Sequence, residues 1–204
     1  MNPYARIPAV CCMLTLSCAA LAGCSAGGGS VTLELADKGR VLTQKFPHAY
    51  ITQVQEGEYD VILVDKATDW DYASSARKNR PLIPVALDPA RHLMHIHLYW
   101  RPLAGTTRNP AATNASIDWY VLGPEGTDDY VAYQGAGYVA LHGSGDEHTV
   151  FIRDGQISRK AGRGSLQDPI GAASISGSAV AKPDRARVQE LLAEVEKQAG
   201  VAQR

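Results

Sequence analysis

The sequence predicts a mainly β fold, either an antiparallel β-sandwich or a partly closed barrel, with one C-terminal amphipathic helix. Roughly ten short segments alternate apolar and polar residues or are rich in β-branched and aromatic residues, and turn-forming residues separate them. No alternation of strand and helix patterns is visible, which disfavours a parallel sheet. The one clear helical pattern comes last in the chain.

The first predicted strand, residues 31–35, alternates apolar and polar side chains. Residues 49–54 and 59–64 are rich in β-branched and aromatic residues and are predicted to form a hairpin, with Gly57 in the turn. Residues 82–87 are apolar but include Pro84, which lacks a backbone donor. An edge strand or a bulge is therefore expected there.

Residues 92–101 give the strongest strand pattern in the chain, and residues 116–122 give the next strand. Successive side chains of a strand point to opposite faces. One face of the first strand carries Met94, Ile96, Leu98 and Trp100, and the other carries His95, His97, Tyr99 and Arg101. The first set is expected to face the core.

Five further short strands are predicted in the second half of the chain. They are residues 130–133, 138–142, 149–153, 156–159 and 172–181. The stretch Gly135-Ala136-Gly137 is expected to form a turn between the first two. Asp154-Gly155 is typical of a tight hairpin turn and is expected to separate the next two. The last strand is built of small residues, which would let another element approach closely.

A C-terminal helix is predicted over residues 183–199. Pro183 suits a first turn, and Gly200 can end the helix. Four apolar residues form a stripe at helical spacing: Val188, Leu191, Leu192 and Val195. A helix of about four turns is marginal alone in water, so this one is expected to pack across a sheet.

The N-terminal residues have the pattern of a secretory signal. Arg6 precedes an apolar run of roughly 15 residues, which is shorter than the roughly 20 that a spanning helix needs. The run ends at Leu21-Ala22-Gly23-Cys24, which resembles the lipobox of bacterial lipoprotein precursors. That resemblance implies removal of residues 1–23 as a signal peptide and lipidation of Cys24. Two or more acyl chains hold a protein stably on a bilayer.

The domain organisation follows from this resemblance. Residues 24–30 would be the lipidated Cys24 and a flexible Gly-rich tether, and residues 31–204 a single β-rich domain. The expected partner is the membrane, through the lipid on Cys24, and the expected location is the bacterial cell envelope. The residue after Cys24 is Ser25 and not Asp. By resemblance to the lipoproteins of enteric-type bacteria, this implies sorting to the outer membrane.

Composition excludes some classes of function. The net charge is −1, from 20 basic and 21 acidic residues mixed along the chain, so nucleic acid is not an expected partner. The remaining cysteines are Cys11, Cys12 and Cys18, all within the predicted signal. An internal disulfide is therefore not expected, and stability must come from packing.

The most informative polar pattern is His95-Ile96-His97. Two histidines at i and i+2 of one strand point the same way and could share a metal ion such as zinc. His142 and His148 could add ligands from a loop. The alternative is a solvated polar face with no cofactor, because a third ligand is not fixed by the sequence.

Three functions remain open from the sequence. The first is a non-enzymatic, lipid-anchored envelope domain that binds another envelope component or has a structural role, because no complete catalytic set is visible. The second is a metal-dependent site around His95 and His97, with hydrolysis as a candidate reaction. The third is a carrier of a small apolar ligand in a barrel cavity.

Overall fold

The computed structural model describes residues 27–36, 39–65, 91–102, 113–124, 127–166 and 170–200. Its strands, in chain order, are β1 (Gly28–Leu35), β2 (Val41–Phe46), β3 (His48–Gln55), β4 (Glu58–Val64), β5 (Arg91–Leu98), β6 (Ala115–Leu122), β7 (Tyr130–Ser144), β8 (Glu147–Arg163) and β9 (Ala172–Pro183). The helix α2 spans Arg185–Ala199. The prediction of a mainly β fold with one C-terminal helix is confirmed.

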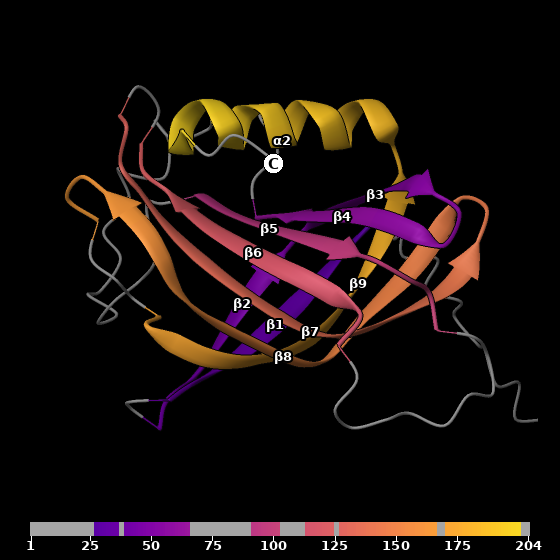
Figure 1. The fold of residues 1–204 in the computed structure, drawn as a ribbon, viewed down its shortest axis with the longest axis horizontal. Helices are drawn as coiled ribbons and strands as arrows, with labels where there is room; N and C mark the ends of the chain where they lie inside the picture. The colour runs from indigo at the N-terminus through magenta and orange to yellow at the C-terminus, as the bar shows by residue number, and fades with distance from the viewer. Residues whose placement is uncertain are drawn as a thin grey trace, which may run out of the picture.

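The strands form one curved sheet in the order β2-β1-β9-β3-β4-β5-β6-β7-β8 (Figure 1). β8 also pairs with β9, so the strands from β3 to β9 make a ring, and the β1–β2 hairpin extends along β9. The pairs are antiparallel except for a short parallel contact between β3 and β9. This contact joins only Tyr50 to Lys182 and Ile51 to Pro183, so the ring closes weakly at this seam.

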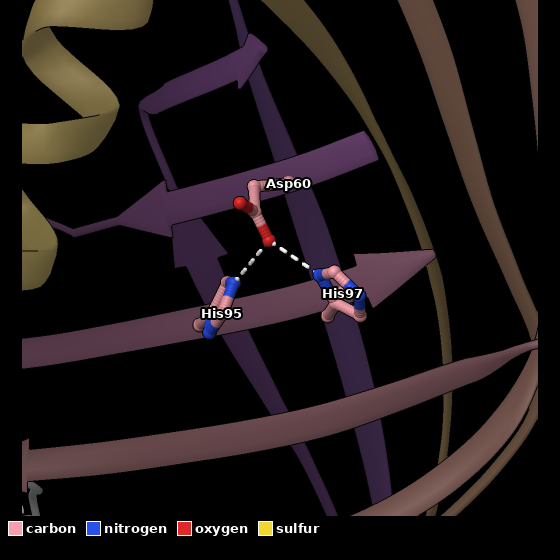
Figure 2. A group of neighbouring side chains, drawn as sticks. All are labelled: Asp60, His95 and His97. Atoms are coloured by element: carbon pink, nitrogen blue, oxygen red, sulfur yellow. Dashed lines mark hydrogen bonds and ion pairs between the residues drawn. The ribbon is translucent and has the colours of Figure 1, made fainter. Parts of the chain in front are cut away.

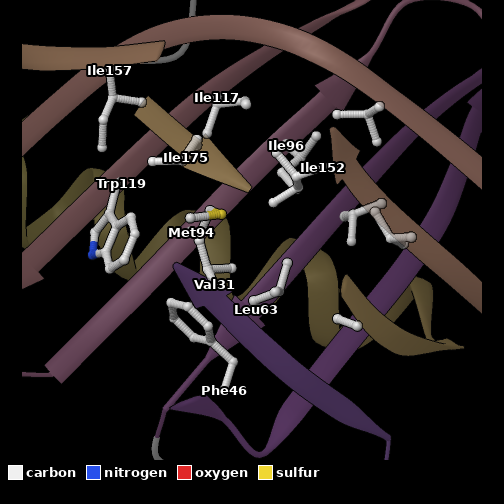
Figure 3. Packing of buried hydrophobic residues seen from close by; sticks show 14 of the residues in the cluster. Val31, Phe46, Leu63, Met94, Ile96, Ile117, Trp119, Ile152, Ile157 and Ile175 are labelled. Carbon is white, nitrogen blue, oxygen red and sulfur yellow. The ribbon is translucent and has the colours of Figure 1, made fainter. Parts of the chain in front are cut away.

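The hydrophobic core fills the inside of the ring (Figure 3). Alternate residues of each strand point inward, as the faces of β5 illustrate: Met94 and Ile96 are fully buried. Phe46 packs edge-on against Trp119, with ring centroids 5.5 Å apart. Trp119 Nε1 donates a hydrogen bond to Nδ1 of the buried His92, which satisfies both polar groups.

A second, smaller core lies on the outer face of the sheet, beneath α2 (Figure 1). The helix buries Val188, Leu191 and Val195 there, and Leu192 is partly buried. The predicted stripe is therefore confirmed. The helix begins after Asp184, whose side chain caps it by accepting a hydrogen bond from the Arg187 N–H, because Pro183 still belongs to β9.

Several predicted boundaries are wrong. Gly28 to Ser30 belong to β1 and not to a tether, because they pair with β2 and β9. The stretch around Gly135 lies inside the continuous strand β7, and Asp154-Gly155 lies inside β8, where the register shifts at a bulge. The actual turn between β7 and β8 contains Gly145, whose φ is +74°.

The glycines of β7 were predicted to form a turn, but they lie where β7 and β8 approach each other closely. A Cβ at Gly135 would overlap the carbonyl oxygen of Gln156 on β8, and one at Gly137 would come within 2.6 Å of the Asp154 carbonyl oxygen. These glycines permit strong coiling of a paired strand, and they do not mark a chain reversal. By contrast, the predicted hairpin between β3 and β4 is confirmed, with Gly57 at φ +78°.

Residues 1–26 and 66–90 lie outside the described residues. The predicted signal peptide, the lipidation of Cys24 and the strand over residues 82–87 fall there. In the ranges that are described, no helix has the length and apolarity needed to cross a membrane.

Candidate metal centre

Strands β4 and β5 place three polar side chains together on the outer face of the sheet, beside the area that α2 covers. The strands pair antiparallel, with Asp60 opposite His97 and Ile62 opposite His95. Because alternate residues share a face, Asp60 lies on the same side as Ile62, which packs beneath the helix. The prediction that His95 and His97 share a face opposite Met94 and Ile96 agrees with this arrangement.

Both histidines contact the same oxygen of Asp60 (Figure 2). His95 Nε2 and His97 Nδ1 are each 2.8 Å from Asp60 Oδ1. The side chains are 14%, 24% and 16% exposed for His95, His97 and Asp60, so the group is sheltered but open to solvent on one side. The three ligand atoms all lie within 4.8 Å of one another.

A fourth side chain, Glu58, holds the other ring nitrogen of His97. Its Oε1 is 2.7 Å from His97 Nε2. A neutral imidazole carries only one N–H, and a carboxylate only accepts hydrogen bonds. A metal on Nδ1 would leave the N–H on Nε2, which faces Glu58. The exposed Tyr99 packs edge-on against His97, with centroids 4.8 Å apart, and restrains the ring further.

The electrostatics favour an ionised Asp60. Burial alone would raise the pKa of Asp60, but the hydrogen bonds and the charges of His95 and His97 together outweigh it, and the pKa lies below its ordinary value. Asp118 lies opposite His95 on β6 and behaves differently. Burial raises the pKa of Asp118, and the positive charges of His95 and Lys160 offset this only in part.

The three side chains are of the types that hold zinc in proteins, and their ligand atoms would have to move to hold the ion. Zinc bonds of about 2.0–2.2 Å place neighbouring ligand atoms roughly 3.3 Å apart. Each histidine nitrogen is 2.8 Å from Asp60 Oδ1, so both of these contacts would have to lengthen by about 0.5 Å around an ion. Two imidazoles and one carboxylate would leave a coordination position for water or a ligand.

No protein-family model matches the chain. Neither a curated protein nor a solved structure matches it.

The other predicted metal ligands lie elsewhere. His142, on β7, packs edge-on against the Phe151 ring at 5.4 Å. His148, at the start of β8, lies 6.4 Å from the ring of Tyr59, which packs against the interior core. Neither belongs to the group formed by Asp60, His95 and His97.

Sequence reasoning missed the two acidic members, Glu58 and Asp60. Their i, i+2 spacing was a usable signal, since it matches the spacing of His95 and His97, although Glu58 directly precedes the strand predicted over residues 59–64. The pairing of β4 with β5 could not be predicted from the sequence, because a long stretch of chain separates the two strands. Asp60 and His95 are 35 residues apart.

Proposed function

We propose that this chain is a lipid-anchored protein of the bacterial cell envelope whose β domain binds a divalent transition-metal ion, with zinc as the preferred ion. Asp60, His95 and His97 would be its ligands. The observation that carries the metal proposal is the convergence of three ligand atoms within 4.8 Å. The anchor rests on the resemblance of residues 21–24 to a lipobox.

The arrangement of Glu58 supports a metal over a purely structural hydrogen-bond network. Histidine ligands of metals almost always donate their second N–H to a carboxylate, carbonyl or water. Glu58 Oε1 lies 2.7 Å from His97 Nε2 as an ion-pair contact, and Nδ1 of the same ring faces Asp60. The described interior of the ring is filled by core side chains, so the outer face is the better candidate for function than an apolar cavity.

Metal analysis tests the proposal. The protein is purified in detergent without a histidine tag, supplied with zinc and dialysed. We expect about one zinc per chain, and we expect the His95→Ala/His97→Ala and Asp60→Asn variants to lose it. His142→Ala is the matched control and should keep its zinc. Substoichiometric zinc in the unmodified protein, or full retention in both ligand variants, would overturn the metal site.

The Glu58→Gln variant tests whether Glu58 supports His97 as a metal ligand. An amide can still accept the His97 N–H, but it lacks the charge that raises ligand basicity. We expect zinc affinity to fall roughly 10- to 100-fold, while one ion per chain still binds at saturation. An affinity equal to that of the unmodified protein would contradict the orienting role of Glu58.

The anchor has a separate test. Cells grown with labelled palmitate should label the protein, and Cys24→Ser should abolish both the label and the membrane fractionation. An unlabelled protein, or a Cys24→Ser variant that stays in the membrane fraction, would remove the anchor from the proposal. This result would not affect the proposal of the metal site, which the metal analysis tests separately.

A further inference from the structure

A recess opens where the ring of strands is weakest, at the seam between β3 and β9. It has a volume of about 460 Å³. Its lining includes Ile51, Tyr59, Arg101, Ser144, His148 and Arg185. The recess forms because β9 leaves the ring at Pro183 and continues into α2 after only two paired residues with β3. The polar side chains that converge here play no part in the metal centre.

Arg101 is held in place by the end of β7. Its Nε donates to the carbonyl oxygen of Leu141, and its Nη2 donates to that of Gly143, each at 3.2 Å. A guanidinium carries five N–H donors in a fixed fork, so most of them stay available to another acceptor. Among the ion pairs of the described ranges, none involves Arg101. A fixed guanidinium without a carboxylate is suited to bind an oxyanion.

His148 brings a second polar group to the same recess. Its Nδ1 is buried and has no hydrogen-bond partner among the described residues. A buried polar atom left in this way destabilises the fold, and native proteins rarely tolerate it. Burial, followed by the nearby charge of Arg101, lowers the pKa of His148. A bound anion would counter the charge of Arg101 and would lie beside the imidazole of His148.

The rest of the lining also favours an anion. Arg185 is exposed at the start of the 15-residue helix α2, whose N-terminus carries partial positive charge. The one carboxylate in the lining, Asp184, is already used as the helix cap, at 2.9 Å from the Arg187 N–H. The Tyr59 ring and Ile51 supply apolar surface beside these charges.

We propose that this recess binds a small organic molecule through an oxyanion group, a carboxylate or a phosphate, held by Arg101 and His148. The carbon part of the ligand packs against Tyr59 and Ile51. Because Tyr59 and Asp60 point to opposite faces of β4, this site is separate from the metal centre and does not depend on it.

Nuclear magnetic resonance on the ¹⁵N-labelled, metal-free full chain in detergent tests the proposal, with succinate and inorganic phosphate as separate probes. We expect saturable shifts of the Gly145 and His148 amides and of the Arg101 side-chain Nε–H. The probe that binds more tightly identifies the oxyanion. Arg101→Gln should weaken binding at least about tenfold, since a charge-assisted bond is lost. Arg153→Gln, an exposed arginine outside the recess that contacts the Phe151 ring, is the matched control.

His148→Phe is the second test, in case Arg101→Gln disturbs the end of β7. It keeps an aromatic ring but removes the polar atoms, and it should also weaken binding. The proposal is overturned by an absence of shifts with both probes at concentrations on the order of 10 mM. It is equally overturned if the affinity of a folded Arg101→Gln or His148→Phe protein equals that of the control.

Discussion

Single residues in this protein derive their properties from strand neighbours that are distant in the sequence. Asp60 accepts hydrogen bonds from two histidines of β5, and these bonds together with the charges of the histidines outweigh the effect of burial on its pKa. Asp118 lies nearby on the same outer face, opposite His95, and burial raises its pKa. The same side-chain type is thus tuned in opposite directions by its partners.

Tyr120 gives a prediction about alkaline pH. Burial, together with the negative charges of Asp118 and Glu196 and the nearby Tyr130, raises its pKa to about 12. Between about pH 10 and 12 the unfolded chain therefore releases a proton that the folded chain keeps. Unfolding becomes more favourable as pH rises through this window. The free energy of unfolding should fall more steeply with pH in the unmodified protein than in Tyr120→Phe.

Denaturant titrations at several pH values measure these slopes. The comparison uses slopes and not absolute stabilities, because removing the hydroxyl has its own cost. Parallel slopes for the two proteins would contradict the raised pKa.

At the scale of elements, apolar packing and an ion pair hold α2 against the sheet. Arg91 on β5 is only 3% exposed, and its Nη1 lies 2.7 Å from Glu194 Oε1 on the helix. The apolar stripe covers Ile62 and Leu122 on the outer face. The helix therefore protects hydrophobic residues that would otherwise face water.

Two adjacent leucines of α2 test this packing. Leu191 is 1% exposed, whereas Leu192 is only partly buried at the edge of the contact. Leu191→Ala should lower the free energy of unfolding by about 2–4 kcal/mol, and Leu192→Ala by clearly less. Both changes remove the same atoms and alter helix propensity equally, so the difference reports burial. Equal losses in denaturant titrations would show that the helix is rotated from the position described.

The close pairing of β7 and β8 gives a second prediction at this scale. Gly135→Ala places a Cβ against the Gln156 carbonyl oxygen, so the two strands must separate. We expect a loss of about 2 kcal/mol or more in the free energy of unfolding. Ala136→Ser, at the neighbouring exposed position, is the control and should change it by less than about 0.5 kcal/mol. A neutral Gly135→Ala would show that the strands can separate there at no cost.

At the scale of the whole molecule, β9 is the strand that pairs with both early and late strands of the chain. It pairs with β1, β3 and β8, so the ring cannot close until nearly the entire chain is present. Such non-local pairing is typical of slow-folding β proteins. The helix, in contrast, adds to a ring that is already complete.

Two truncations separate these roles. A chain that ends after Pro183 keeps β9 but exposes the residues beneath α2. We expect it to keep the β-sheet signal in circular dichroism and to bind a hydrophobic dye. A chain that ends after Gly171 also lacks β9, and it should lose cooperative unfolding altogether. Cooperative unfolding of the shorter chain would show that β9 is dispensable for the ring.

The sequence by itself determined the fold class, the C-terminal helix with its buried stripe, the β3–β4 hairpin and the shared face of His95 and His97. These features depend on the local period of side chains along one element. Only the tertiary structure decided that β7 and β8 run through their glycines, that β9 closes the ring and that Glu58 and Asp60 meet the two histidines. Strand pairing depends on contacts between segments far apart in the chain, and no local pattern records which strands will be neighbours.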